Sequence, residues 1–482
     1  MSYSDTVLTT IIIYKLVLIG IGLWANKRTH NTEDYFIAGH QLGPWVAAIS
    51  SAASASSAWT LLGMSGAAYV MGLSAIWIVP AVVCGYLFNW LWLAPRLQDQ
   101  NQKHKAITLT EFIANNITGN TRHIIVVCSF CIVFAFTFYI AAQFQAAGTT
   151  FASTFDISMP EAVITGTAII LFYTLLGGFW AVSITDTMQG LLMALAALIV
   201  PVAALITVGG PSELWLQMQT AFSEQQLSFS GAHSGFIGLA FIAGLLAIGL
   251  GNPGQPHVVN RMMAIGDKKA VRQATIIAVT WAAIVITGML IVGWCARVLI
   301  DPVSNNEEAL LILTNQLFPP VIAGVIIAAI LSAVMSTADS QLLVSSAAVC
   351  CDLTTDKKHK QKLNNARWTV VFMCLLSMLI ALYAPEDIFS RVLFAWNALG
   401  AAFGPILIII LIGHKIDARY ALASISCGFG FAVALSYLPS TPGDYIERTV
   451  PFLSALFIAW LGRRRYAKEK QRLIGTATDS RF

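Results

Sequence analysis

The sequence has few charged residues. Asp, Glu, Lys and Arg make up 11% of the 482 residues, whereas 57% are hydrophobic. An ordinary soluble protein carries about 25% charged residues. The long apolar runs are instead of the length that crosses a bilayer as a helix. The sequence therefore predicts an all-α integral membrane protein whose surroundings are lipid, and the net charge of only +4 does not point to nucleic acid as a partner.

The signatures of enzyme chemistry are also missing. The 8 cysteines are scattered through apolar segments, and the CxxC at Cys128 and Cys131 lies inside a predicted span without a second pair. No Ser/His/Asp grouping, no paired inward carboxylates and no His/Cys set with metal spacing is found. The stretch 249–254 matches G-x-G-x-x-G, but no strand precedes it, so a dinucleotide site is not expected. We expect a protein that is not an enzyme.

The apolar runs predict about thirteen transmembrane spans. Their approximate ranges are 5–25, 43–70, 73–95, 123–152, 158–178, 180–208, 234–259, 271–300, 320–351, 365–384, 389–413, 418–438 and 446–462. With the N-terminus outside, most of the 28 Lys and Arg residues, Arg261 among them, fall in the stretches that face inward, whereas Lys15 lies within the first span. This bias predicts an outside N-terminus and a cytoplasmic C-terminus. Residues 463–482 are then a basic cytoplasmic tail after one polytopic domain, 1–462.

Two of these spans are predicted to be broken. The second contains the Ser- and Ala-rich run 50–58, and the seventh contains Gly249 to His257, with two prolines and three glycines. The two spans are five apart, so spans 2–6 (about 43–208) and 7–11 (about 234–413) are interpreted as two repeats. An odd number of helices per repeat places the copies in opposite orientations, which is the inverted-repeat design of secondary transporters.

One span carries hydroxyl groups along a single face. Ala333, Ser336, Thr337 and Ser340 follow helical spacing, and Asp339 lies next to that face within an otherwise uncharged run. Clustered hard oxygens suit a small hard cation such as sodium. The alternative for each hydroxyl is helix packing, because small hydroxylated side chains let helices approach closely.

Several motifs carry a resemblance to a known family. They run in order along nearly the whole chain: Asp34-Tyr35 with Gly39 through Pro44, Trp59 to Ala67, Gly177 to Ser183 with Thr185 to Gln189, Gly254 to His257 followed by Arg261, Ser332 to Leu343, and Ala395-Trp396 with Gly400 to Pro405. Together they resemble the sodium:solute symporter family, most of all its bacterial sodium/proline symporters. The resemblance implies a LeuT-type 5+5 core with one helix before it and two after it, in the bacterial inner membrane.

The resemblance also implies ligands for Na⁺. A first sodium would bind the main-chain carbonyls of Ala53, Ser56 and Ala333 and the hydroxyls of Ser336 and Thr337. Some relatives hold a second sodium, and the matching positions here are Asp186, Asp339 and Ser340. The alternative for Asp186 is a structural carboxylate at a helix end.

The chain departs from its proline-transporting relatives at several positions. It has Ala55, His40 and Ala75 where they have an aspartate, an arginine and a glutamate, and Ile248 and Asn252 where they have a tryptophan and a tyrosine. The changes at 248 and 252 lie where the resemblance places the solute, so proline itself stays open.

The solute site is expected in mid-membrane between the broken helices. The polar and aromatic candidates to line it are Ser57, Thr60, Tyr139, Gln143, Asn252, Trp396 and Asn397. Amides and hydroxyls with a few aromatics suit a small zwitterion or polyol, and no Arg or Lys is expected at that depth. We expect a monomeric sodium-coupled importer of a small organic solute, foremost an amino acid, working by alternating access. A sugar or a carboxylate such as sialic acid as the solute, or a transporter-like nutrient sensor, are the alternatives.

Overall fold

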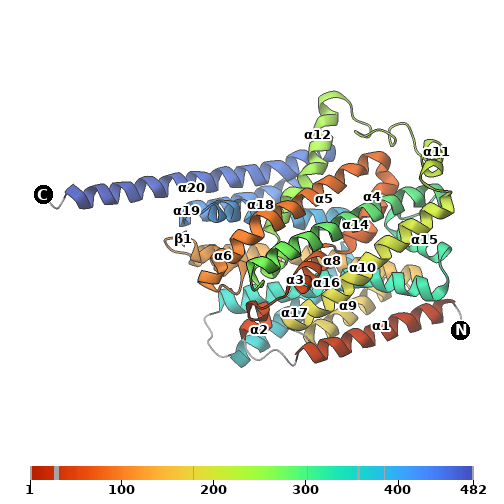
Figure 1. Ribbon diagram of the computed structural model, residues 1–482, viewed down its shortest axis with the longest axis horizontal. Helices are drawn as coiled ribbons and strands as arrows, with labels where there is room; N and C mark the ends of the chain where they lie inside the picture. Colours follow the sequence, from red (N-terminus) through yellow and green to blue (C-terminus); the bar gives the residue numbers. More distant parts are fainter. Residues whose placement is uncertain are drawn as a thin grey trace.

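The computed structural model describes residues 3–26, 32–176, 178–300, 302–354, 359–384 and 386–479, and this part of the chain is almost entirely helical. Long helices lie side by side along one axis, with the two chain ends at opposite ends of the bundle (Figure 1). Among the described residues, ten helical segments are long and apolar enough to cross a membrane. The predicted all-α architecture with many membrane-spanning helices is therefore confirmed.

The helices have the following bounds. They are α1 (Tyr3–Asn26), α2 (Thr32–Ile37), α3 (Pro44–Ala55), α4 (Met64–Met71), α5 (Ile78–Leu87), α6 (Ala94–His104), α7 (Leu109–Asn115), α8 (Arg122–Phe155), α9 (Met159–Leu176), α10 (Phe179–Val208), α11 (Pro211–Ala221), α12 (Gly235–Leu246), α13 (Pro256–Met263), α14 (Lys268–Ile300), α15 (Ala309–Leu317), α16 (Pro320–Ala347), α17 (His359–Tyr383), α18 (Ile388–Leu411), α19 (Ala418–Leu435) and α20 (Tyr445–Asp479).

Short π- and 3₁₀-helical pieces join some of these helices. They are η1 (Ala38–His40), η2 (Trp59–Gly63), η3 (Gly72–Trp77), η4 (Phe88–Leu93), η5 (Ala247–Gly254), η6 (Asn306–Glu308), η7 (Ala348–Leu353) and η8 (Pro442–Asp444). Two very short parallel strands, β1 (Ile117–Thr118) and β2 (Ile416–Asp417), pair at one end of the bundle.

The first predicted break lies between α3 and η2. The helix α3 ends at Ala55, and Ser56 leaves the helical region with φ −95° and ψ 72°. Helical structure resumes in the π-type turn η2. Serine hydroxyls compete for backbone groups and weaken a helix, which is why the Ser- and Ala-rich run opens here. The break predicted in the second span is therefore present.

The second predicted break lies between α12 and α13. The α-helix changes to the 3₁₀ turn η5 at Ala247, and Gln255 is extended with φ −83° and ψ 107° before α13 begins at Pro256. Proline cannot continue the α-helical hydrogen-bond ladder, so Pro253 and Pro256 account for the interruption. Two discontinuous helices thus occupy the positions that the sequence predicted.

The helices α16 and α18 form the interior of the bundle. Each has 83% of its most apolar window buried, more than any other span of the described chain. Helix α16 packs against α1, α3, α8, α10 and α17. It is therefore the central element against which the first broken helix rests.

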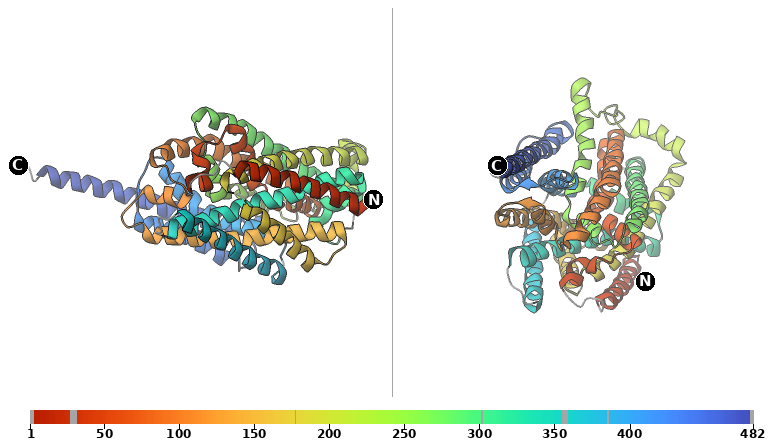
Figure 2. Two further views of the ribbon diagram at one scale, coloured as in Figure 1. Left: turned by 90° about the horizontal axis from the view of Figure 1, so that it is seen from below. Right: turned by 60° about the vertical axis from the view of Figure 1, so that its left-hand side comes forward.

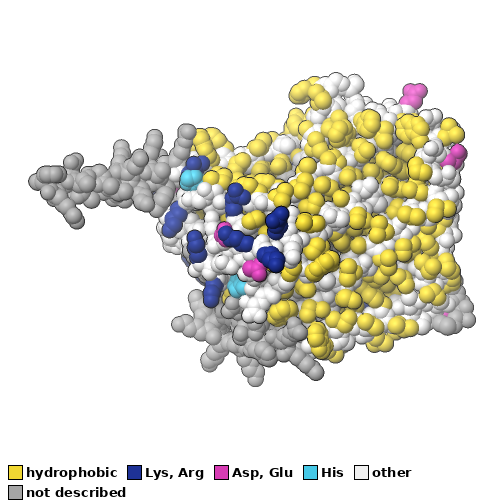
Figure 3. All heavy atoms as spheres, in the orientation of Figure 1, with side chains coloured by type: hydrophobic (Ala, Val, Ile, Leu, Met, Phe, Trp, Pro, Cys, Tyr) yellow, Lys and Arg dark blue, Asp and Glu magenta, His cyan; other side chains and the backbone are white. Residues whose placement is uncertain are grey.

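The surface is hydrophobic along the helices and charged mainly at the two ends. Helix α20 projects from one end of the bundle (Figure 2). Lysine and arginine side chains gather at that end, and the acidic side chains visible on the face drawn in Figure 3 lie there and at the opposite end. The side chains of α20 beyond Arg463, which include the predicted basic tail, lie outside the described residues.

Candidate functional site

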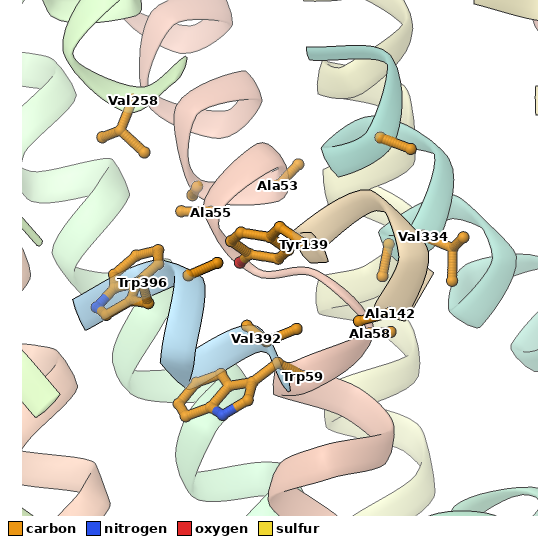
Figure 4. Packing of buried hydrophobic residues seen from close by; sticks show 14 of the residues in the cluster. Ala53, Ala55, Ala58, Trp59, Tyr139, Ala142, Val258, Val334, Val392 and Trp396 are labelled. Carbon is orange, nitrogen blue, oxygen red and sulfur yellow. The ribbon is translucent and has the colours of Figure 1, made fainter. Parts of the chain in front are cut away.

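A narrow cavity lies where the first broken helix faces the second. Its walls come from the break after α3, from α5, α8 and η5, and from α18. The lining residues are Ala55, Ser56, Trp59, Thr60, Val82, Tyr86, Tyr139, Ile248, Asn252, Val392, Leu393 and Trp396. Three aromatic side chains, Trp59, Tyr139 and Trp396, surround this space together with Val392 (Figure 4).

The polar groups of the cavity differ in what they already bind. The indole nitrogen of Trp396 donates to the carbonyl of Ile248 at 3.2 Å, and the Tyr139 hydroxyl donates to Ser57 Oγ at 3.3 Å. The indole Nε1 of Trp59 has no hydrogen-bond partner among the described residues. The Tyr86 hydroxyl has Ser56 beside it but makes no hydrogen bond of good geometry there. Buried donors are normally satisfied, so these two groups are available to a solute.

Four of the seven predicted solute residues line this cavity. They are Thr60, Tyr139, Asn252 and Trp396. Ser57 lies behind the wall, where its hydroxyl accepts from the Trp59 amide at 3.2 Å. Gln143 is also behind the wall, and its Oε1 accepts from the Ala58 amide at 3.1 Å. Both side chains satisfy backbone or hydroxyl groups that the helix break leaves free.

Asn397 is not part of the cavity. It lines a separate surface groove with Glu386 and Arg448, because it follows Trp396 by one residue and so points to another face of α18. The sequence analysis did not include Trp59, Val82, Tyr86, Val392 or Leu393 among the solute residues. Trp59 could have been found as the first aromatic residue after the break, whereas nothing in the local sequence singles out Tyr86.

Three of the five predicted oxygens of the first sodium site, those of Ala53, Ala333 and Ser336, come together. Ser336 Oγ donates to the carbonyl of Ala53 at 3.1 Å and lies 3.2 Å from the carbonyl of Ala333. Thr337 Oγ1 donates to the carbonyl of Ser54 at 3.0 Å. Both hydroxyl residues are fully buried. Helix α16 is thus joined to the end of α3 by neutral oxygens of the kind that replace the hydration shell of a hard cation.

The predicted second sodium position contains an arginine side chain. Arg261 on α13 is 1% exposed, and its Nη2 lies 2.5 Å from Asp186 Oδ2 and 2.6 Å from Ser340 Oγ. Its Nε donates to Ser50 Oγ at 3.1 Å and its Nη1 to the His257 carbonyl at 2.8 Å.

The location of Arg261 corrects one expectation. The sequence analysis grouped it with the inward-facing basic residues and expected no arginine at the depth of the site. The helix break carries Arg261 back into the bundle, where the carboxylate of Asp186 compensates its charge. Asp339, the remaining acid, has Ser340 beside it, but neither carboxylate oxygen makes a hydrogen bond of good geometry among the described residues.

Comparison with known proteins shows which family this chain resembles. Residues 35–428 match the family model described as the sodium:solute symporter family. The chain is 31% identical over 486 residues to the osmoregulated proline transporter OpuE of Bacillus subtilis, covering 98% of each chain. It is 33% identical over 442 residues to the sodium/proline symporter of Escherichia coli, covering 89% of this chain and 87% of that one.

A solved structure has a similar fold. The substrate-bound outward-open structure of a Na⁺-coupled sialic acid symporter superimposes with a TM-score of 0.77 over 94% of this chain and 96% of that one, at 20% sequence identity. At this identity the likeness concerns the fold, which is LeuT-like.

Proposed function

The chain belongs to the sodium:solute symporter family. From the residues that line its cavity and from its proline-transporting relatives, we propose that the solute it imports with sodium is a small zwitterionic amino acid such as proline. Sodium-coupled symport of a small organic solute is the activity of the protein, which is not an enzyme.

The residues that line the cavity support an amino acid as the solute. Among the described lining residues there is no Asp, Glu, Lys or Arg, and most are apolar or aromatic. A solute of net charge would stay uncompensated there, and a polyol would leave most of its hydroxyls without partners. The lining suits a compact zwitterion with an apolar ring or chain, because its carboxylate can accept from the free Trp59 indole and its carbon skeleton can pack on Val392 and Leu393. The same argument disfavours a sugar or sialic acid.

Ile248 and Asn252 do not argue against an amino acid. Ile248 adds an apolar wall, and Asn252 is held by the close approach of two helices, with its carbonyl accepting from Asn89 Nδ2 at 3.0 Å. These two residues therefore shape the cavity, and they would set which amino acid of this size fits best.

Uptake into proteoliposomes tests the solute. Labelled proline should accumulate only when an inward sodium gradient is imposed, and unlabelled amino acids should compete more strongly than hexoses or sialic acid. The variant Trp59→Phe removes one donor and keeps the ring, so its apparent affinity for the solute should fall by about five- to tenfold. Its sodium dependence should stay unchanged. Sodium-driven uptake of a sugar with no competition by amino acids would overturn the proposal.

For the first sodium we propose the five oxygens of Ala53, Ser56, Ala333, Ser336 and Thr337 as ligands. The support is the contact of Ser336 with the Ala53 and Ala333 carbonyls across two helices. A sodium ion at this position would draw the broken helix and α16 together, and solute that docks on the broken helix would then bind better. One charge crossing ~100 mV yields ~2.3 kcal/mol, and a tenfold gradient adds ~1.4 kcal/mol. That suffices for roughly 500-fold accumulation.

We further propose thirteen spans in two inverted repeats, about 43–208 and 234–413, within one domain, 1–462. The support is that the two helix breaks fall at the start of each proposed repeat. We propose a monomer in the bacterial inner membrane with the N-terminus outside. The gathering of Lys and Arg at the end that bears α20 supports a cytoplasmic C-terminus (Figure 3).

A further inference from the structure

Asp339 is a buried acid that the solute cavity and the first sodium site do not use. It is fully buried in α16, and its two oxygens have Ser340 beside them but make no hydrogen bond of good geometry among the described residues. A buried carboxylate at this depth is strongly unfavourable, because it has lost its contact with bulk water. In its ionised form, Asp339 therefore needs a cation beside it.

Each side-chain nitrogen of the nearest arginine already has a partner. Arg261 uses its three nitrogens on Ser50, on the His257 carbonyl, and on Asp186 with Ser340. Asp186 and Arg261 compensate each other, so this pair leaves no positive charge for Asp339. The cation must come from another element or from solution.

Helix α1 contributes a lysine that lies against the face of α16 on which Asp339 is located. The hydroxyl of Tyr14 lies 2.6 Å from Ser332 Oγ, and the ammonium of the next residue, Lys15, contacts Met335 Sδ. Ser332, Met335 and Asp339 follow spacings of three and four, so they form one stripe along α16. Lys15 thus lies one helical turn from Asp339, and Asp339 is the charged group that acts on it electrostatically. A flexible four-carbon stem lets an ammonium cover that distance.

We propose that Lys15 is the resident counter-cation of Asp339, so that the chain itself fills the second cation position and one sodium ion is carried per solute. Arg261 neutralises Asp186, and Lys15 neutralises Asp339. Because the position already contains two acids and two bases, a second sodium would meet no net negative charge. The inference rests on the sodium coupling of the proposed function, but it does not depend on which solute is carried.

Thermal unfolding of the purified full chain tests the pair without any solute. In potassium buffer, Lys15→Met and Asp339→Asn should each lower the melting temperature, and the double variant should lose less than the sum of the two losses. Lys15→Arg is the matched control that keeps the charge, and it should stay close to the unchanged protein. Additive losses in the double variant would overturn the pairing, as would a Lys15→Met variant as stable as the Lys15→Arg control.

Sodium titration of the same variants tests the ion count. The melting temperature of the unchanged protein should rise with sodium as expected for one bound ion. The variant Lys15→Met leaves Asp339 without its counter-cation, so its melting temperature should show a second sodium-dependent rise. The double variant Lys15→Met/Asp339→Asn should lose this second rise. Two-ion behaviour in the unchanged protein, or one-ion behaviour in Lys15→Met, would overturn the inference. Failure of the proposed solute would appear separately, as absent proline uptake with these titrations intact.

Discussion

In the proposed sodium site, two hydroxyl groups are the ligands that a substitution can remove. Ser336 and Thr337 are the only two hydroxyls among the five proposed oxygens, since the others are main-chain carbonyls. A carbonyl cannot be removed by substitution, but a hydroxyl can. These two side chains are therefore where the ion site is open to experiment. Their neighbours on α16 include serines such as Ser346, whose hydroxyl bonds only within its own helix, to the Leu343 carbonyl.

Replacing both hydroxyls should weaken sodium binding. Ser336→Ala with Thr337→Ala removes two ligands, each worth about 1 kcal/mol, so the sodium concentration for half-maximal uptake should rise roughly 30-fold. The maximal rate at saturating sodium should change less. Ser346→Ala on the same helix is the control and should leave the sodium dependence unaltered. An unchanged half-maximal concentration in the double variant would reject the assignment.

At the scale of elements, buried charged side chains join segments that are far apart in the sequence. The Asp186–Arg261 pair connects α10 to α13, directly after the second break. Glu307, in η6 outside the spans, connects its loop to the start of α18, because its Oε1 accepts from the Phe389 amide at 2.9 Å. Phe389 in turn stacks on Trp59 of the cavity wall, with 5.7 Å between ring centroids. The second link therefore acts on a wall of the cavity.

Breaking the Asp186–Arg261 ion pair should lower the free energy of unfolding. Asp186→Asn leaves the buried guanidinium of Arg261 without its counter-charge, which should reduce the free energy of unfolding by about 3–5 kcal/mol. The double variant Asp186→Asn/Arg261→Gln removes both charges and should recover part of that loss in a thermal-unfolding assay. The sodium-to-solute ratio of Asp186→Asn should stay at that of the unchanged protein. A lower ratio would instead make Asp186 a ligand of a second sodium ion.

The buried carboxyl group of Glu307 should make the stability of the protein depend on pH. Burial, reinforced by Asp387, raises the pKa of Glu307 from 4.5 to about 7, although the Ile388 and Phe389 amides and Arg391 act in the opposite direction. The folded state therefore holds the proton more tightly than the unfolded state. The resulting stabilisation is complete below pH 4.5 and is lost as the pH rises to about 7, by at most about 3 kcal/mol.

Glu307→Gln tests this pH dependence. The variant cannot ionise, so its melting temperature should fall less than that of the unchanged protein between pH 4.5 and 7. Glu308→Gln, one residue along the same turn, is the matched control. Identical pH profiles for Glu307→Gln and the unchanged protein would contradict a buried, proton-binding carboxyl at this position.

At the scale of the whole molecule, the charge distribution orients the bundle. The termini lie at opposite ends, and the basic side chains gather at the end that bears α20 (Figure 3). A tag fused after Phe482 should be digested by added protease in inside-out membrane vesicles and protected in intact cells. A tag before Met1 should behave in the opposite way. Digestion of both tags from the same side would contradict an odd number of spans.

Local features of the sequence were sufficient for much of this description. The apolar runs, the two breaks and the hydroxyl face of α16 follow from composition, from proline and serine chemistry and from helical spacing. Each of these depends on residues within a few turns of one another, so each is readable along the chain. Four solute residues could also be predicted because the breaks themselves could be predicted. Thr60 and Asn252 lie at the breaks, and Tyr139 and Trp396 lie on the helices that face them.

Only the folded chain brings together groups that are distant in sequence. The tertiary structure turned Arg261 from an apparent water-facing residue into the partner of Asp186, and it placed Asn397 outside the cavity and Tyr86 inside it. It also set Lys15 of α1 beside the stripe that contains Asp339. The physical reason is that burial and charge compensation are properties of several packed helices together, and no spacing within one helix specifies them.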